Sequence, residues 1–408
     1  MSPLASRPTA FVPAGWDVFI STQSLLAVVA FVLLAGCGPS VNRYLLIEAS
    51  LRAHDPKGAD AIVQRSEKEY GEKSRLLYGM DRGMTLQLAG DYQQSNAVLE
   101  QAEEELDRLY TRKIRTETLA FMTNDTELPY EGDPYEQVLI NVLKAVNYAV
   151  LGQWQDALVE ARRIDHRLNV LSDRTKEKNA YREDGFARYL SGILYESTGD
   201  VNNAFIAYRN AYETFEAIRA WSHTAVPPQL RADLLRTAEA LHFTQEMAEY
   251  QHVFPDTRWE TSQSLQQLAQ VVVISYNGRA PRKEDQFLDL PISLDALQLV
   301  LLNRGLSQAN RQSNRGVDTV LYGLNGHVVR VALPRLAPQK TQVPVDRVSL
   351  IQDNGTRVAL NTELVHNVTS LADKALSERM AGITVKALSR AATKFALAEG
   401  TTRAAQQA

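Results

Sequence analysis

The sequence predicts an α+β multidomain protein, in which an N-terminal all-α part made of helical hairpins precedes a small mixed α+β domain with C-terminal helices. Three observations lead to this prediction. Residues 44–250 are rich in Ala, Leu, Glu, Gln and Arg at helical spacing and poor in proline. Gly90, Gly152 and Gly199 each occupy the same place in similar short segments. After Pro255, β-branched runs and turn signals replace the helical period.

The composition is that of a globular protein and excludes several classes. Hydrophobic residues make up 45% and charged residues 23% of 408 residues, which is sufficient for ordinary cores. The 44 basic and 48 acidic residues give a net charge of −4, so there is no general electrostatic reason to bind nucleic acid. The single cysteine, Cys37, excludes an intrachain disulfide and a Cys-rich metal site. We expect no cofactor.

Cys37 follows an apolar run that predicts a lipoprotein signal peptide over residues 1–36. Residues 25–36 (LLAVVAFVLLAG) carry no polar side chain, and this run is too short to span a membrane but suits the core of a signal peptide. Residues 34–37 (LAGC) resemble the lipobox of bacterial lipoproteins, in which the cysteine becomes the mature N-terminus and carries lipid. The alternative is a buried helix that ends in a core cysteine.

The lipobox resemblance implies a compartment. The mature chain would be anchored in the bacterial cell envelope through acyl chains such as palmitate at Cys37. Gly38, in place of an aspartate, resembles lipoproteins that are sent to the outer membrane and face the periplasm.

The glycine-centred segments resemble tetratricopeptide repeats (TPR). Each glycine has Gly or Ala seven residues before it and Ala or Ser five residues after it. The glycine lets one helix turn tightly into the next, and the small residues let the two helices pack closely. The resemblance implies a TPR-like helical domain over residues 37–255, with residues 44–70 as an opening half-repeat. The glycines are spaced more widely than the 34 residues of the repeat, so we expect hairpins separated by insertions.

A small α+β domain is predicted over residues 265–400, with a C-terminal helix pair and a disordered tail at 401–408. Its strands are expected at 271–276, 286–292, 318–324, 327–333 and 347–352, with a short helix at 294–303 and helical structure again over 360–398.

Five further stretches together resemble a family of uncharacterised bacterial TPR-like lipoproteins. They are residues 77–95, 128–136, 157–165, 185–215 and 271–283. The resemblance covers almost the whole mature chain. It implies a fold and a compartment but no reaction.

No catalytic constellation stands out in the sequence. GxSxG and GxxxxGK[ST] are absent, so neither a nucleophile elbow nor a phosphate-binding P-loop is present. No two of the seven histidines lie three to five residues apart, which is the spacing of a helical metal pair. The run Glu103-Glu104-Glu105 is interpreted as a solvated helix face. We therefore predict that the protein is not an enzyme and holds no metal.

The first candidate binding site is the groove of the helical hairpins. In the TPR-like frame, the first helix of each hairpin lines the concave face, which gives a partner-binding groove of six residues: Val142, Val146, Ala149, Tyr189, Ile193 and Glu196. An apolar groove is normally covered, so we expect a segment of a partner protein to occupy it. The alternative is that the insertion at 110–136 or the C-terminal helices fill it from the same chain.

Residues 157–165 (ALVEARRID) add charges to one predicted helix. Arg162 or Arg163, if it faces inward, needs a carboxylate such as Glu160 or Glu136, because an unpaired buried charge is costly. A structural Glu–Arg pair is favoured over a ligand clamp.

The second candidate site is the segment after the turn signal Asn277-Gly278. Arg279, Arg282 and Lys283 concentrate positive charge there, and arginine forks suit phosphate or carboxylate oxygens, so an anionic glycan or lipid is a candidate ligand. Lys386, Arg390 and Lys394 form a second basic stripe at helical spacing. The alternatives are solvated basic surfaces, or arginines that pair with carboxylates of the helical domain.

The leading hypothesis is a lipid-anchored cell-envelope scaffold or adaptor that binds a protein partner through its TPR-like repeats. Machinery for cell-wall synthesis, polysaccharide export or pilus and secretin assembly would fit this compartment, and the residues choose none of them. The rival hypothesis is an enzyme or binding module that acts on a glycan or lipid through the α+β domain. A deep polar pocket with convergent carboxylates would favour the rival.

Overall fold

A computed structural model describes residues 41–116, 128–173, 184–291, 328–339, 345–351 and 355–407. Cys37 with the predicted signal peptide, and the elements predicted at 294–303 and 318–324, lie outside the described residues. The described residues are mostly helical and include two small antiparallel sheets, which confirms the predicted fold class.

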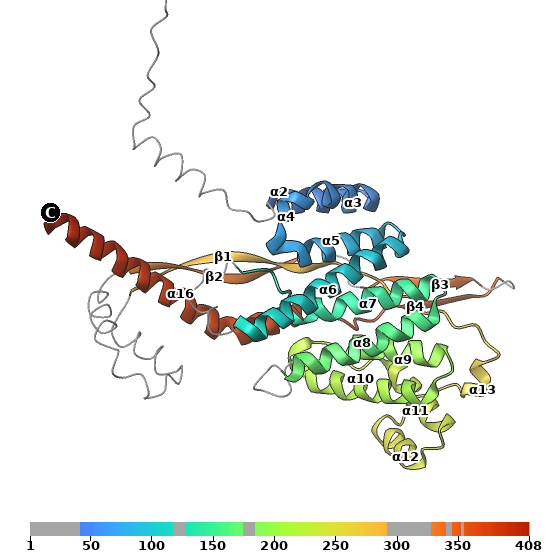
Figure 1. Cartoon of the computed structure of the whole chain (residues 1–408). Coiled ribbons are helices and arrows are strands. Elements are labelled where there is room, and N and C mark those ends of the chain that lie inside the picture. The colour runs from blue at the N-terminus through green and yellow to red at the C-terminus, as the bar shows by residue number, and fades with distance from the viewer. Residues whose placement is uncertain are drawn as a thin grey trace, which may run out of the picture.

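The helices of the N-terminal part form pairs that stack one after another, from α2 at one end to α12 at the other (Figure 1). The pairs are α2 (Val41–Arg52) with α3 (Pro56–Arg65), α5 (Arg75–Leu88) with α6 (Tyr92–Thr116), α7 (Pro134–Val150) with α8 (Trp154–Asp173), α9 (Gly185–Ser197) with α10 (Val201–Ser222), and α11 (Pro228–Ala240) with α12 (Thr244–Val253). The short helices α4 (Glu67–Tyr70) and η1 (Glu72–Ser74) precede α5, and α13 (Ser262–Leu265) follows α12.

The turn of each pair contains one residue in the left-handed region of backbone space. These residues are His54, Gly90, Gly152, Gly199 and His242, with φ between 57° and 83°. Glycine adopts this conformation at little cost, which explains the three turns found from sequence. The expected half-repeat at 44–70 contains a complete pair, α2 with α3, and the pair α11 with α12 was not predicted, because histidine stands in both of these turns.

The small residues of the repeat frame lie where the paired helices approach most closely. A Cβ atom added to Gly192 of α9 would lie 2.3 Å from the Tyr208 ring of α10, and one added to Gly83 of α5 would lie 2.4 Å from Leu99 of α6. Neither distance is sterically allowed. The glycines therefore let Tyr208 and Leu99 fill the space between the helices, as the repeat frame requires.

The C-terminal part consists of two hairpins and one long helix. Strand β1 (Arg279–Pro291) pairs antiparallel with β2 (Val328–Gln339), and β3 (Arg347–Ile351) pairs antiparallel with β4 (Arg357–Asn361). Helix α16 (Val368–Gln407) ends the described chain. It packs on β1 and β2 and reaches α7 and α10 with its N-terminal half, while its C-terminal half points away from the helical pairs (Figure 1).

Three expectations for this part are wrong. Residues 271–276 are not a strand, because no ladder joins them to another described residue. The expected helix pair is a single helix, α16, which also includes residues 401–407 of the expected disordered tail, and residues 360–361 belong to β4. The expected basic loop is the start of β1, although Gly278 does adopt a turn conformation at φ +85°.

The core of the C-terminal part is shared with the helical part. Ala372 and Ala375 of α16 are buried against Tyr135 of α7, with Leu336 of β2 packed beside them. The α+β elements thus bury apolar surface on α7 rather than only on one another. Among the described helices, none is both long and apolar enough to cross a membrane.

Candidate functional site

The six predicted groove residues are buried or partly buried in the structure. Val142 and Tyr189 are buried in the largest apolar cluster, and Val146, Ala149 and Ile193 pack against that cluster. All of them lie on α7 and α9, the first helices of their pairs, as the frame predicted. Other parts of the same chain thus cover Val142 and Tyr189, whereas the other four residues keep partial exposure.

Two segments of the C-terminal part contribute to this cover. Ile274 and Val365 pack against the same apolar cluster. The segment around Ile274 has no regular secondary structure, and the segment around Val365 leads into α16. The chain thus packs on this apolar cluster through two segments that are neither the insertion at 110–136 nor a C-terminal helix, which the alternative had named. Partner binding by the six residues stays a prediction, and it would require these segments to move away.

The polar members of the predicted groove belong to a buried network between α9, α10 and α11. Arg236 of α11 donates to both carboxylate oxygens of Glu196 at 2.7 Å and to Asp233 at 2.6 Å. Tyr189 donates to Asp233 at 2.8 Å, and Tyr208 donates to Glu196 at 2.7 Å. Burial raises the pKa of the Asp233 carboxyl despite the nearby guanidinium. Glu196 is thus a structural partner of Arg236 in this structure.

A second buried network joins α6, α7 and α8. Lys144 of α7 is 0% exposed, and its ammonium contacts three carboxylates. These are Glu100, Glu103 at 2.8 Å and Glu160 at 3.0 Å. Arg163 of α8 lies 2.9 Å from Glu103 and 3.3 Å from Glu160. We call these five residues the Lys144 cluster.

The Lys144 cluster bears on two interpretations of the sequence, of which one is wrong and one is confirmed. Glu103 is buried, so the run at 103–105 is not simply a solvated face. The expected Glu–Arg pair is confirmed as Glu160 with Arg163, whereas Glu136 accepts hydrogen bonds from Tyr130 and from the backbone of Asp133 instead. The missed signal is Lys144 itself, the single charged residue of the helical stretch 138–150, because a buried cation requires carboxylate partners.

The carboxylates of the cluster differ in their pKa values for physical reasons. Burial acts to raise the pKa of Glu103, but hydrogen bonds from Lys144 and Asn141 hold that pKa below its usual range. At Glu160 burial dominates, and the pKa of that carboxyl is raised. The Asn141 amide donates to both carboxylates, at 3.0 Å and 2.9 Å. Arg167 of α8 adds a third cation to these surroundings, 3.7 Å from Glu103.

The Lys144 cluster also has the oxygen geometry of a cation site. Carboxylate oxygens of Glu100, Glu103 and Glu160 all lie within 4.8 Å of one another, and hard divalent cations prefer such ligands. The ammonium of Lys144 contacts all three carboxylates and occupies the place that a metal ion would take. We therefore assign the cluster to internal ion pairing.

The predicted anion-binding residues all lie in β1, and each contacts a carboxylate. Arg279 pairs with Glu48 of α2, Arg282 lies 2.6 Å from Glu284 within β1, and Lys283 lies 2.6 Å from Asp133. Two of the three thus reach the helical part, which agrees with the alternative that they pair with its carboxylates. Anion binding by these residues stays a prediction.

Asp133 holds three parts of the chain together. It is the N-cap of α7, where it forms a capping box with Glu136, and only 1% of it is exposed. Its carboxylate accepts from Lys283 of β1 and Arg379 of α16. An aspartate at a helix N-terminus is also favoured by the helix dipole.

In the second basic stripe, the side chains of Arg390 and Lys394 lie outside what the structure describes.

The N-terminus of α9 provides a similar contact with the segment before α16. Asp184 caps α9 through the Ala187 N–H, and His366 Nε2 lies 3.2 Å from its other oxygen. Burial opposes the charge on Asp184, yet His366 and the Ala187 N–H hold the pKa of the carboxyl below its usual range. Asn367 donates to the backbone of Ser222 at 2.9 Å. Residues 366–379 are thus attached to α7, α9 and α10.

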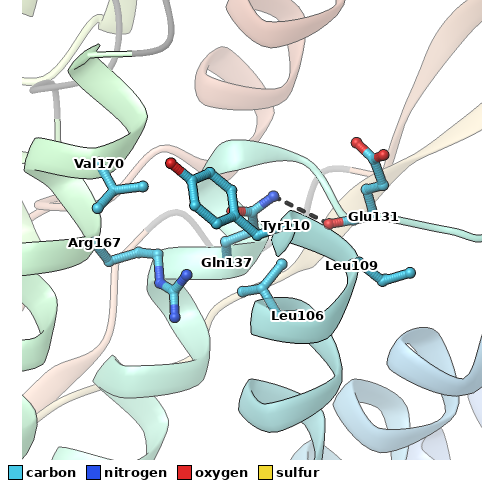
Figure 2. Close-up of a pocket in the computed structure, with 7 residues that line it drawn as sticks. All are labelled: Leu106, Leu109, Tyr110, Glu131, Gln137, Arg167 and Val170. Atoms are coloured by element: carbon cyan, nitrogen blue, oxygen red, sulfur yellow. Dashed lines mark hydrogen bonds between the residues drawn. The ribbon is translucent and has the colours of Figure 1, made fainter. Parts of the chain in front are cut away.

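A hollow lies between α6 and α8 (Figure 2). Its volume of about 310 Å³ includes open solvent. It is lined mainly by apolar side chains: Leu106, Leu109, Tyr110, Glu131, Gln137, Arg167 and Val170. The Gln137 side-chain amide donates a hydrogen bond to the Glu131 backbone carbonyl at 3.0 Å. Arg167 forms an ion pair with Asp107 at 3.0 Å. The hollow thus lacks the convergent carboxylates that the rival hypothesis requires.

No protein-family model and no curated protein matches the chain. Solved structures similar to it include MamA (residues 41 to the end) from Desulfovibrio magneticus RS-1, with 13% identity and TM-score 0.32, covering 52% of this chain and 90% of that one. BtubC from P. vanneervenii has 12% identity and TM-score 0.34, covering 62% and 91%. A Podospora anserina protein with nearly identical TPR-like repeats has 16% identity and TM-score 0.32, covering 52% and 90%. These TM-scores are too low to support a conclusion about this chain, so the description of its repeats rests on its own geometry.

The Lys283–Asp133 contact predicts that the basic segment stabilises the fold. Lys283→Ser should lower the free energy of unfolding by about 1–3 kcal/mol, because it removes a cation from a buried carboxylate. Arg282→Ser is the matched control and should change it by less than about 0.5 kcal/mol, because Arg282 is exposed and pairs only with a near neighbour in the same strand. Urea unfolding of both variants measures the difference. Equal stability of the two, combined with salt-sensitive loss of binding to phosphatidylglycerol vesicles in Lys283→Ser, would instead support anion recognition.

Proposed function

We propose that the protein is a lipid-anchored scaffold of the bacterial cell envelope that holds a protein partner and carries out no reaction of its own. The scaffold proposal rests on the observation that the buried carboxylates are paired with cations. The carboxylates of the Lys144 cluster and of the Arg236 network are each paired with a cation of the same chain. Groups committed in this way hold helices together and are not free to act on a substrate.

The anchor in this proposal is Cys37. Its support is the sequence LAGC at 34–37 after an apolar run of signal-peptide length. With lipid on Cys37, the mature chain would face the periplasm, and Gly38 favours the outer membrane as its destination.

The partner surface in this proposal is the β3–β4 hairpin. Its cross-strand pairs Val348 with Leu360 and Leu350 with Val358 place four apolar side chains on one face. Leu360 is 61% exposed and Leu350 is 41% exposed. A two-stranded hairpin is only marginally stable alone, and no further strand pairs with it among the described residues.

The occupant that fits this hairpin is an extended apolar segment of an envelope protein, added as a third strand. Backbone hydrogen bonds would supply affinity, and apolar side chains would cover the exposed face. This surface is independent of the six groove residues, which the chain itself covers.

The anchor is tested at the N-terminus of the protein purified from membranes. Mass spectrometry should find Cys37 as the first residue, with the added mass of a diacylglycerol thioether. Cys37→Ala should keep residues 1–36 and carry no lipid, because the thiol is the site of attachment. Gly38→Ser is the control that should still be processed. A mature N-terminus at any other residue contradicts the anchor.

The partner surface is tested by photo-crosslinking in cells of the source type. A photoreactive residue at Leu360, on the apolar face, should form an adduct with an envelope protein, and Leu350→Glu should abolish that adduct. The same residue at Ala359, which points to the opposite face, is the matched control and should form none. Equal adducts from both positions, or an adduct insensitive to Leu350→Glu, would contradict the assignment.

A further inference from the structure

The first helix of the stack has an apolar face that no other described element covers. The inner side of α2 packs Tyr44, Ile47 and Leu51 against α3 and α5. On the opposite side, Leu45 is 48% exposed and Leu46 is 59% exposed. The other exposed residues of α2 follow at helical spacing from these two: Asn42, Ala49 and Arg52. We call this side the outer face of α2.

The outer face of α2 is unusual for its position. Helix α2 lies at one end of the stack of pairs (Figure 1). In repeat proteins the terminal element normally carries a polar outer side, because no further repeat covers it. Here two adjacent leucines lie on that side, and the exposed charge is Arg52, which pairs with Glu48 at 2.7 Å. The outer face of α2 thus resembles a surface that contacts another molecule.

The length of chain before α2 limits what this face can contact. The argument rests on the proposed lipid anchor. Cys37 and the first residue of α2, Val41, are four residues apart, and four extended residues span at most about 14 Å. If acyl chains hold Cys37 at the bilayer surface, the start of α2 lies within that distance of the lipid headgroups.

We propose that the outer face of α2 lies on the lipid surface, with Leu45 and Leu46 inserted among the headgroups. Interfacial helices bury apolar side chains at the boundary of headgroups and acyl chains in this way. Arg52 on the same side, and the exposed Lys57 just after it, lie where lipid phosphates are found. The stack of pairs would then stand away from the membrane, with α12 at the distal end.

The test places a fluorescent reporter on the outer face. In the mature protein the thiol of Cys37 is consumed by lipid, so Leu46→Cys introduces the single free thiol. The lipidated protein is labelled there with an environment-sensitive dye and reconstituted in vesicles of phosphatidylethanolamine and phosphatidylglycerol. Val253→Cys, at an exposed valine of α12, is the matched control. We expect a blue shift and quenching by lipid-linked quenchers at position 46 and neither effect at position 253.

The outcomes separate this inference from the proposed anchor. A protein that carries no lipid on Cys37 contradicts the anchor. A lipidated, vesicle-bound protein whose label at 46 is as exposed to water as the label at 253 contradicts only the membrane contact. A blue shift that persists in detergent and rises with protein concentration would show a second copy on this face, which also contradicts a lipid surface as its occupant.

Discussion

The arrangement of the helices depends on the Lys144 cluster. A buried ammonium must be neutralised where it lies, and here the neutralising carboxylates come from the helices on both sides, α6 and α8. Apolar packing alone tolerates sliding or rotation of one helix on another, whereas ion pairs in a buried site hold only in one register. We infer that the cluster thereby fixes α7 between its neighbours. The Arg236 network has the same role between α9, α10 and α11.

The position of α7 in turn determines where the C-terminal part attaches. Its N-cap, Asp133, accepts from Lys283 and Arg379, which come from two different elements of that part. Ile274 and Val365, which lie before β1 and before α16, also pack on the main apolar cluster of the helical part. The C-terminal part therefore covers some of the apolar surface of the helical pairs. For this reason we assign the partner to the exposed β3–β4 hairpin and the membrane to α2.

The sequence predicted the elements whose cause is local. Glycine turns and helical periodicity located three helical pairs, and β-branched runs located β1, β2 and β3. It missed the turns at His54 and His242, because a left-handed histidine has no reliable local signal. It placed a strand at 271–276, where composition favours one but no described strand pairs with it. The Lys144 cluster was missed because burial of Glu103 depends on helices that follow it in the chain.

The central claim is tested most directly by a double-mutant cycle between Lys144 and Glu160. Lys144→Met, Glu160→Gln and the double variant are compared by urea unfolding at pH 7. Lys144→Met alone should cost about 3–5 kcal/mol, because it leaves the buried carboxylates of Glu103 and Glu160 with only the partly exposed Arg163 as a shared cation. If the cluster fixes the helices, the two changes should be coupled by about 1–3 kcal/mol, with the double variant less destabilised than the sum. Additive effects within about 0.5 kcal/mol would contradict the account.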